Sequence, residues 1–148
     1  MPRFLTDVML ERLARWLRVL DVDVESAGAT TADRDLVRRA AEEGRVLLTR
    51  DRRLPGEQGA APGEHLVVRS AAPLEQLAEV VQRFGIRAPA ELFTRCLLCN
   101  VPLEPAPGAD VAQPARRCPR CGRLYWEGSH TRRMRAALAR VLGDTPGA

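Results

Sequence analysis

The chain has 148 residues, of which 45% are apolar and 28% are charged, and its formal net charge is +4. This length accommodates one compact domain with a small appended module, and it excludes two large domains. The apolar fraction and the mixture of charges exclude a disordered chain. Residues 1–90 contain equal numbers of arginines and acidic residues, so the whole positive excess arises from residues 91–148.

The N-terminal segment MPRFLTDVMLERLARWLRVL is amphipathic and rich in arginine. Asp7 and Glu11 interrupt it, it contains no continuous apolar run, and no cleavage motif of small residues follows. These features support neither secretion nor a membrane span. We therefore expect a cytoplasmic protein whose four cysteines are reduced.

Strands and helices are predicted to alternate along residues 4–90. Apolar residues at helical spacing predict helices over 9–20, through Leu36 and Ala40 up to Gly44, and over Pro73–Phe84. The Pro- and Gly-rich segment 55–64 is predicted to be an irregular loop that could gate a site. The expected strands are 4–6, 22–25, 46–48 and 65–69.

This alternation is typical of an α/β fold. Strand-helix-strand units connect by right-handed crossovers, so the pattern predicts a mostly parallel sheet between two layers of helices. Functional residues of such sheets lie at the carboxyl ends of the strands. Asp7 directly follows the expected strand 4–6, and Asp51 closely follows the expected strand 46–48. Both residues therefore lie at the carboxyl ends of strands.

Two pairs of cysteines form the strongest chemical signal in the sequence. Cys96 and Cys99 make one C-x2-C pair, Cys118 and Cys121 make the second, and the segment 100–117 separates the pairs. This spacing is typical of a four-thiolate zinc site, in which each pair forms a tight turn. The proline-rich segment between the pairs cannot build its own core, so the metal is expected to supply most of its folding free energy. A redox dithiol or four free thiols are the alternative interpretation.

Arginines surround the cysteine pairs and continue into a C-terminal helix. Basic residues interspersed with aromatic ones suit contacts to phosphates and bases. We interpret the arginines as phosphate ligands, whereas Tyr125 and Trp126 are expected to pack the ribbon against the first domain. The arginines are Arg95, Arg116, Arg117, Arg120, Arg123, Arg132, Arg133, Arg135 and Arg140.

Asp7, Asp33 and Asp51 form a second candidate site, with Asp35 as the alternative to Asp33. Asp7 and Asp51 lie at strand ends, and Asp33 begins the helix between these strands. Three carboxylates that converge there would suit a divalent cation that polarises a phosphodiester. The pattern leaves another interpretation open, in which Asp33 caps its helix together with Thr30 and Asp51 begins a turn.

Four segments occur here in an order that resembles one known family. They are RFLTDVMLERLARWLRVL, EEGRVLLTRDR, RCLLCNVPLEP and RRCPRCGRLYWEGSHTRRM. Together they resemble the Mut-seven C-terminal RNase domain family, over Phe4 to about Met134. The resemblance implies a PIN-like nuclease domain over residues 1–90, followed by a zinc ribbon and a basic terminal helix over residues 91–148, with RAPAE (87–91) at the boundary.

The resemblance also implies that Asp7, Asp33 and Asp51 are catalytic and bind Mg²⁺ or Mn²⁺, with single-stranded RNA as the substrate class. Asp35 remains the alternative to Asp33. The chain departs from the family pattern in two ways. Glu11 and Asp21 stand where glycine is expected, and Ser70 follows the strand at 65–69, where many PIN nucleases place a fourth carboxylate. The second departure favours one bound ion over two.

We therefore hypothesise a Mg²⁺- or Mn²⁺-dependent ribonuclease, with the endonucleolytic or exonucleolytic mode left open, whose zinc ribbon assists RNA binding. Arg12 or Arg50 would contact the scissile phosphate, whereas Arg15 is better interpreted as a solvated helix residue. The alternative is a non-catalytic RNA-binding or ribosome-associated adaptor that retains the PIN-like fold.

Overall fold

A computed structural model describes residues 1–59 and 64–143 of the chain, and its centre is a four-stranded parallel sheet. The strand order is β2-β1-β3-β4, and every pairing in this sheet is parallel. The strands are β1 (Phe4–Thr6), β2 (Val24–Ser26), β3 (Val46–Thr49) and β4 (His65–Val67).

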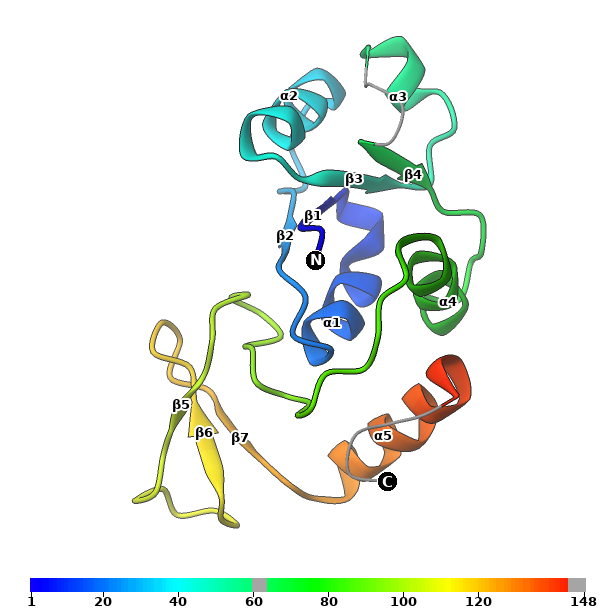
Figure 1. Cartoon of the computed structure of the whole chain (residues 1–148). Helices are drawn as coiled ribbons and strands as arrows, with labels where there is room; N and C mark the ends of the chain where they lie inside the picture. Colours follow the sequence, from blue (N-terminus) through cyan, green and yellow to red (C-terminus); the bar gives the residue numbers. More distant parts are fainter. Residues whose placement is uncertain (60–63, 144–148) are drawn as a thin grey trace.

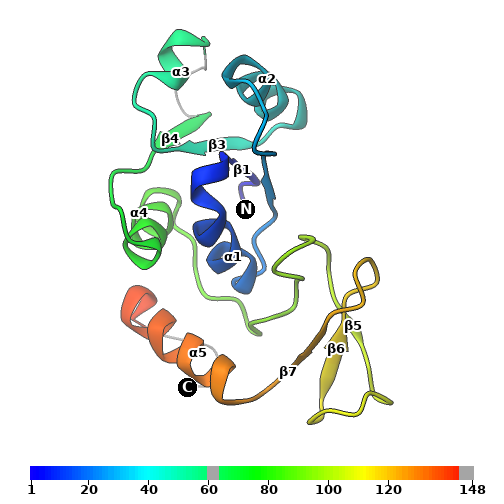
Figure 2. The same cartoon turned by 180° about the vertical axis from the view of Figure 1, so that it is seen from behind.

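Helices cover both faces of the sheet, as Figures 1 and 2 show. The 3-10 helix η1 (Val8–Leu10) and α1 (Glu11–Val19) lie on the same face as α4 (Pro73–Phe84). The opposite face carries α2 (Asp33–Glu43) and α3 (Leu54–Glu57). The predicted three-layer α/β architecture is confirmed.

Each face of the sheet has its own apolar layer. Successive side chains of a strand point to opposite faces, so Phe4 and Leu48 enter one layer while Leu5 and Leu47 enter the other. Both faces of β1 and β3 therefore carry apolar side chains, as is usual for buried parallel strands. The helix predicted to end at Gly44 does so, because Gly44 adopts a left-handed φ of 64°. Glycine is favoured at such a helix end.

The structure corrects two local predictions. Segment 55–64 was expected to be irregular, but α3 begins at Leu54, which is buried against the α2 side of the sheet, with Pro55 tolerated in the first helical turn. Residues 60–63 of that segment lie outside the described residues. The strand expected at 22–25 begins only at Val24, because the N–H of Val22 still donates to the carbonyl of Leu17 at the end of α1.

The C-terminal part consists of a small antiparallel ribbon and the helix α5 (Ser129–Leu142). Leu138 of α5 is fully buried in the larger apolar layer, and α5 lies beside α4 (Figure 1). The terminal helix therefore adds to the core of the N-terminal sheet, while the division into 1–90 and 91–148 stays a prediction. The ribbon strands are β5 (Glu104–Pro105), β6 (Ala115–Arg117) and β7 (Leu124–Trp126).

A membrane-spanning helix needs about 20 predominantly apolar residues. Within residues 1–59 and 64–143, no helix is long and apolar enough to cross a bilayer.

Candidate metal centre and acidic strand ends

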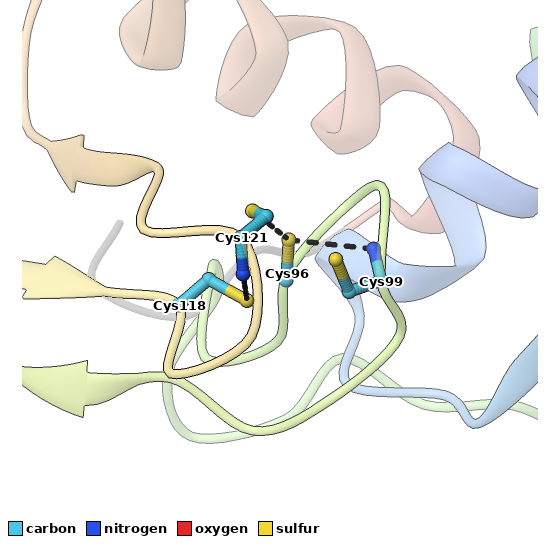
Figure 3. A group of neighbouring side chains, drawn as sticks. All are labelled: Cys96, Cys99, Cys118 and Cys121. Atoms are coloured by element: carbon cyan, nitrogen blue, oxygen red, sulfur yellow. Dashed lines mark hydrogen bonds between the residues drawn. The ribbon is translucent and has the colours of Figure 1, made fainter.

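The four cysteines converge on one point, as Figure 3 shows. Their Sγ atoms all lie within 4.8 Å of one another, and the Sγ atoms of Cys96 and Cys121 are 3.8 Å apart. A tetrahedral zinc site with Zn–S bonds of about 2.3 Å requires sulfur atoms about 3.8 Å apart. The cysteines carry no disulfide. The predicted pairs are thus placed to hold a metal ion.

The two cysteine turns have the same hydrogen-bond pattern. In each turn, the N–H of the second cysteine donates to the Sγ of the first, at 3.4 Å. The residue after the second cysteine is Asn100 in one turn and Gly122 in the other, with φ of 63° and 77°. The N–H of each of these residues donates to the carbonyl of the first cysteine. This repetition orients both sulfur pairs toward a common centre.

Tyr125 supports the first cysteine turn. Its hydroxyl donates to the Sγ of Cys96 at 3.2 Å and accepts from the N–H of Leu97 at 3.0 Å. Burial raises the pKa of the Cys96 thiol, but the Tyr125 hydroxyl and nearby N–H donors outweigh it and lower this pKa to about 6. Burial and the neighbouring thiols raise the pKa of Cys99 to about 12. The hydrogen bonds around Cys96 therefore favour the thiolate form, which is the form that binds metals.

A buried arginine connects this turn to the parallel sheet. Arg18 of α1 is only 2% exposed, and its guanidinium donates to the carbonyls of Val24 and Leu97 at 2.7 Å and to the hydroxyl of Ser26 at 2.9 Å. Burial lowers the pKa of Arg18, and the nearby Glu11 counteracts this effect. The sequence placed Arg18 among exposed helix arginines, and no local signal could reveal its distant partner Leu97.

Asn100 makes the second connection to the sheet. Its side-chain oxygen accepts from the N–H of Val24 at 3.0 Å, and its side-chain nitrogen donates to Asp23 at 2.7 Å. The N–H of Val24 faces outward from the edge strand β2, where it would otherwise lack a sheet partner. The first cysteine turn is therefore fixed to the edge of the sheet by both Arg18 and Asn100.

Replacing the buried guanidinium should destabilise the protein strongly. Arg18→Met keeps the aliphatic stem but leaves the carbonyls of Val24 and Leu97 without donors, so we expect a loss of about 3 kcal/mol in the free energy of unfolding. Denaturant unfolding of the metal-loaded protein measures this loss.

Arg15→Met on the same helix is the matched control for Arg18→Met. Arg15 is exposed, and its ion pair with Glu11 is long at 3.8 Å. An exposed pair of this kind contributes little, so the change in the free energy of unfolding should stay within about 0.5 kcal/mol. Equal losses for the two variants would contradict the assigned role of Arg18.

Asp7 and Asp51 lie at the carboxyl ends of the two central strands. The hydroxyl of Thr49, at the end of β3, donates to Oδ2 of Asp7 at 2.6 Å and accepts from the N–H of Asp51 at 3.1 Å. The N–H of Asp7 donates to the carbonyl of Leu48, which holds the two strand ends together. Oδ1 of Asp51 also accepts from the N–H of Arg53, so the turn interpretation of Asp51 describes one of its contacts.

The topology places these two residues at the point where the strand order reverses. The chain leaves β1 through α1 on one face of the sheet, and it leaves β3 toward α3 on the other face (Figure 1). In open parallel sheets, ligands bind in the crevice that forms where adjacent strands diverge in this way. Asp7 and Asp51 lie at this point of the sheet.

Asp33 is exposed at the first position of α2, and Asp35 follows in the same turn. The capping interpretation of Asp33 is wrong, because Ala32 occupies the N-cap position and makes no side-chain cap. Asp35 is ion-paired with Arg38 at 2.6 Å. In the part of the chain that the structure describes, the four cysteines are the one group of three or more Cys, His, Asp or Glu whose ligand atoms lie within 4.8 Å, so the three aspartates do not meet at that distance.

An acidic group also reaches the end of β4, from an unexpected element. Both oxygens of Glu79 in α4 accept backbone N–H groups, from Arg69 at 3.0 Å and from Ser70 at 2.8 Å. Burial raises the pKa of Glu79, but these donors outweigh it, so this pKa is lower than usual. The sequence showed Ser70 at this strand end and gave no indication that a helix residue would supply a carboxylate there.

The ribbon and α5 border a groove of about 470 Å³. Tyr125 is half-buried and contacts Cys96 and Leu97, Trp126 is 45% exposed, and both line this groove. Their packing against the first domain stays a prediction. The groove arginines are already paired: Arg116 donates to Glu91, and Arg135 donates to Glu127 at 3.1 Å.

Comparisons with known proteins agree with this architecture. The human exonuclease mut-7 homolog is 36% identical over 103 residues, which cover 66% of this chain and 12% of the relative. The chain thus spans about an eighth of that protein's length. No solved structure matches. A family model described as the Mut7-C RNAse domain matches residues 2–138, and the chain therefore belongs to the Mut7-C RNase domain family.

Proposed function

We propose that the protein is a Mg²⁺- or Mn²⁺-dependent ribonuclease that acts at the Asp7–Asp51 edge of the sheet. The observation that carries this proposal is that Asp7 and Asp51 lie together where the strand order reverses, with the Thr49 hydroxyl donating to the Asp7 carboxylate and accepting the backbone N–H of Asp51. Family membership supports RNA as the substrate.

The donor set suits a hard divalent cation. Carboxylate oxygens are the ligands that Mg²⁺ and Mn²⁺ prefer, and such ions usually retain several waters beside one or two carboxylates. Asp7 and Asp51 would hold the ion, and Asp33 would act across water from the start of α2. When bound, the ion lowers the pKa of a coordinated water and stabilises charge on the phosphate oxygens.

Thr49 has a positioning role in this proposal. It is fully buried, and its hydroxyl fixes Oδ2 of Asp7 while accepting the N–H of Asp51. The Thr49 side chain therefore orients the carboxylate of Asp7 and holds the backbone of Asp51 beside it, while the N–H of Arg53 fixes Oδ1 of Asp51. Both carboxylates keep further acceptor sites for a cation beside these hydrogen bonds.

We further propose that the four cysteines hold zinc as a structural ion. Four thiolates in tetrahedral arrangement leave no open coordination position for a substrate, which is typical of structural rather than catalytic zinc. Tyr125 and the N–H groups that face the sulfur atoms supply the hydrogen bonds that such ligands usually receive.

A cleavage assay tests the nuclease proposal directly. Wild-type protein is expected to cleave a labelled single-stranded RNA only when Mg²⁺ or Mn²⁺ is added, and Asp7→Asn is expected to reduce the rate by at least about a hundredfold. Asp110→Asn, on the exposed ribbon, is the matched control and should cleave at the wild-type rate. Wild-type protein that binds RNA but cleaves none with either ion would favour the non-catalytic adaptor instead.

A further inference from the structure

Residues 1–90 have no net charge, but two of their surfaces differ in how their arginines are paired. On the β2 and α2 side, arginines are paired with acids, as Arg38 is with Asp35 and Arg39 is with Glu43. Arg45 on the same side is paired with Asp23 at 2.8 Å. Acidic residues on this side of the sheet therefore neutralise several of its arginines.

The opposite edge of the sheet carries arginines of another kind. A groove of about 860 Å³ runs along the edge strand β4, and Arg52, Arg69 and Arg83 line it. All three are exposed, and none has an ion-pair partner within 4.0 Å among residues 1–59 and 64–143. We call this surface the β4 groove.

One carboxylate does line the β4 groove, and its contacts limit its effect. Both oxygens of Glu79 accept backbone N–H groups at the end of β4, so its charge is partly compensated by these donors. Gln82, which also comes from α4, is polar and uncharged. Three cations against one such carboxylate leave the β4 groove positive.

The β4 groove adjoins the acidic strand ends. Arg52 directly follows Asp51, and Val67 of β4 pairs with Thr49, whose hydroxyl contacts Asp7. The guanidinium of Arg50 also reaches the carbonyl of Arg69 at 3.4 Å. An RNA strand lying in this groove would therefore end near the carboxyl ends of β1 and β3.

We infer that the β4 groove binds the phosphate backbone of single-stranded RNA and directs the strand to the Asp7–Asp51 edge. This inference rests on the proposed function and names the surface that holds its substrate. Arg52, Arg69 and Arg83 supply unpaired guanidinium donors, which suit phosphate oxygens. The ribbon groove is less suited to this task, because Glu91 and Glu127 already neutralise its two arginines.

The test measures binding without cleavage. The zinc-loaded full chain, carrying Asp7→Asn in every sample and without added Mg²⁺ or Mn²⁺, is titrated into a labelled oligouridine of about 16 nucleotides at several salt concentrations. The triple variant Arg52→Gln, Arg69→Gln, Arg83→Gln is expected to bind at least about tenfold more weakly at low salt. Each lost phosphate contact should reduce the slope of log K against log salt by about 0.7, giving a reduction of about 2.

Three comparisons make the result specific. The triple variant with lysine at the same positions should recover most of the salt slope, which a fold defect would not permit. Arg34→Gln with Arg38→Gln on α2 should leave binding unchanged, and Arg117→Gln, Arg120→Gln, Arg123→Gln on the ribbon should have the smaller effect. An unchanged slope in the groove variant, a larger loss in the ribbon variant, or no salt-dependent binding by the parent protein would overturn the inference.

These outcomes are separable from those of the nuclease proposal. Groove-dependent binding in a protein that never cleaves would retain the inference and reject the nuclease activity. Metal-dependent cleavage with unaltered RNA binding by the groove variant would retain the nuclease activity and reject the inference about the β4 groove.

Discussion

Loss of the zinc ion is expected to unfold residues 95–126 while the parallel sheet stays folded. The strands β5, β6 and β7 are very short, and the buried apolar side chains of this segment are few and small, chiefly Ala106 and Ala115 beside Cys96 and Cys118. Structural zinc contributes about 10–16 kcal/mol in small zinc-binding domains, far more than such a core provides. Purified protein should contain one zinc ion per chain.

The variant Cys118→Ser tests this expectation. Cys118 is buried, and its Sγ accepts N–H groups of Arg120 and Cys121, so its loss removes both a ligand and the centre of the second cysteine turn. Hydrogen exchange should show rapid exchange across residues 95–126, with β1 and β3 still protected. Arg120→Ser in the same turn is the matched control and should retain zinc and protection. Undiminished protection in metal-free Cys118→Ser, or a native disulfide between the cysteine pairs, would contradict the zinc assignment.

The order of elements over residues 4–90 could be predicted because its signals are local. Helical spacing of apolar residues, the glycine that ends α2, and the continuous apolar run of β3 are each determined by a few neighbouring residues. The expectation of glycine at position 21 also has a local cause, since Asp21 adopts a left-handed φ of 60°. Glycine adopts that conformation most readily. The two C-x2-C spacings likewise predict a tight turn at each cysteine pair.

The connections between the two parts could not be predicted, because they depend on residues far apart in sequence. In the sequence, nothing distinguishes Arg18 from the exposed arginines of α1, because its hydrogen-bond partner Leu97 is far away along the chain. Glu79 supplies a carboxylate at the end of β4 although it belongs to a helix. A charge count does not show which arginines are paired: it favoured residues 91–148, although Arg52, Arg69 and Arg83 of the β4 groove have no ion-pair partner among residues 1–59 and 64–143 and lie in the part with zero net charge.

Mn²⁺ is expected to raise the melting temperature of the protein by binding at the Asp7–Asp51 edge. The size of this increase should depend on individual aspartates. A ligand at about 100 times its dissociation constant stabilises a protein by about 2.7 kcal/mol. At about 2–4 °C per kcal/mol, wild-type protein with zinc bound should melt about 5–10 °C higher in saturating Mn²⁺. The soft thiolates, already holding zinc, do not compete for this hard ion.

Four asparagine variants separate the roles of the aspartates: Asp7→Asn, Asp33→Asn, Asp35→Asn and Asp51→Asn. Without Mn²⁺ each should melt within a few degrees of wild type, because asparagine retains the acceptor oxygen that Asp7 offers to Met9 and Asp51 offers to Arg53. With Mn²⁺, the shift should vanish for Asp7→Asn and Asp51→Asn. Asp33→Asn should reduce it, whereas Asp35→Asn should keep it, because Asp35 is already paired with Arg38. The reverse order for the last two would assign the third position to Asp35, and a full shift in all four variants would mean that no metal binds at the Asp7–Asp51 edge.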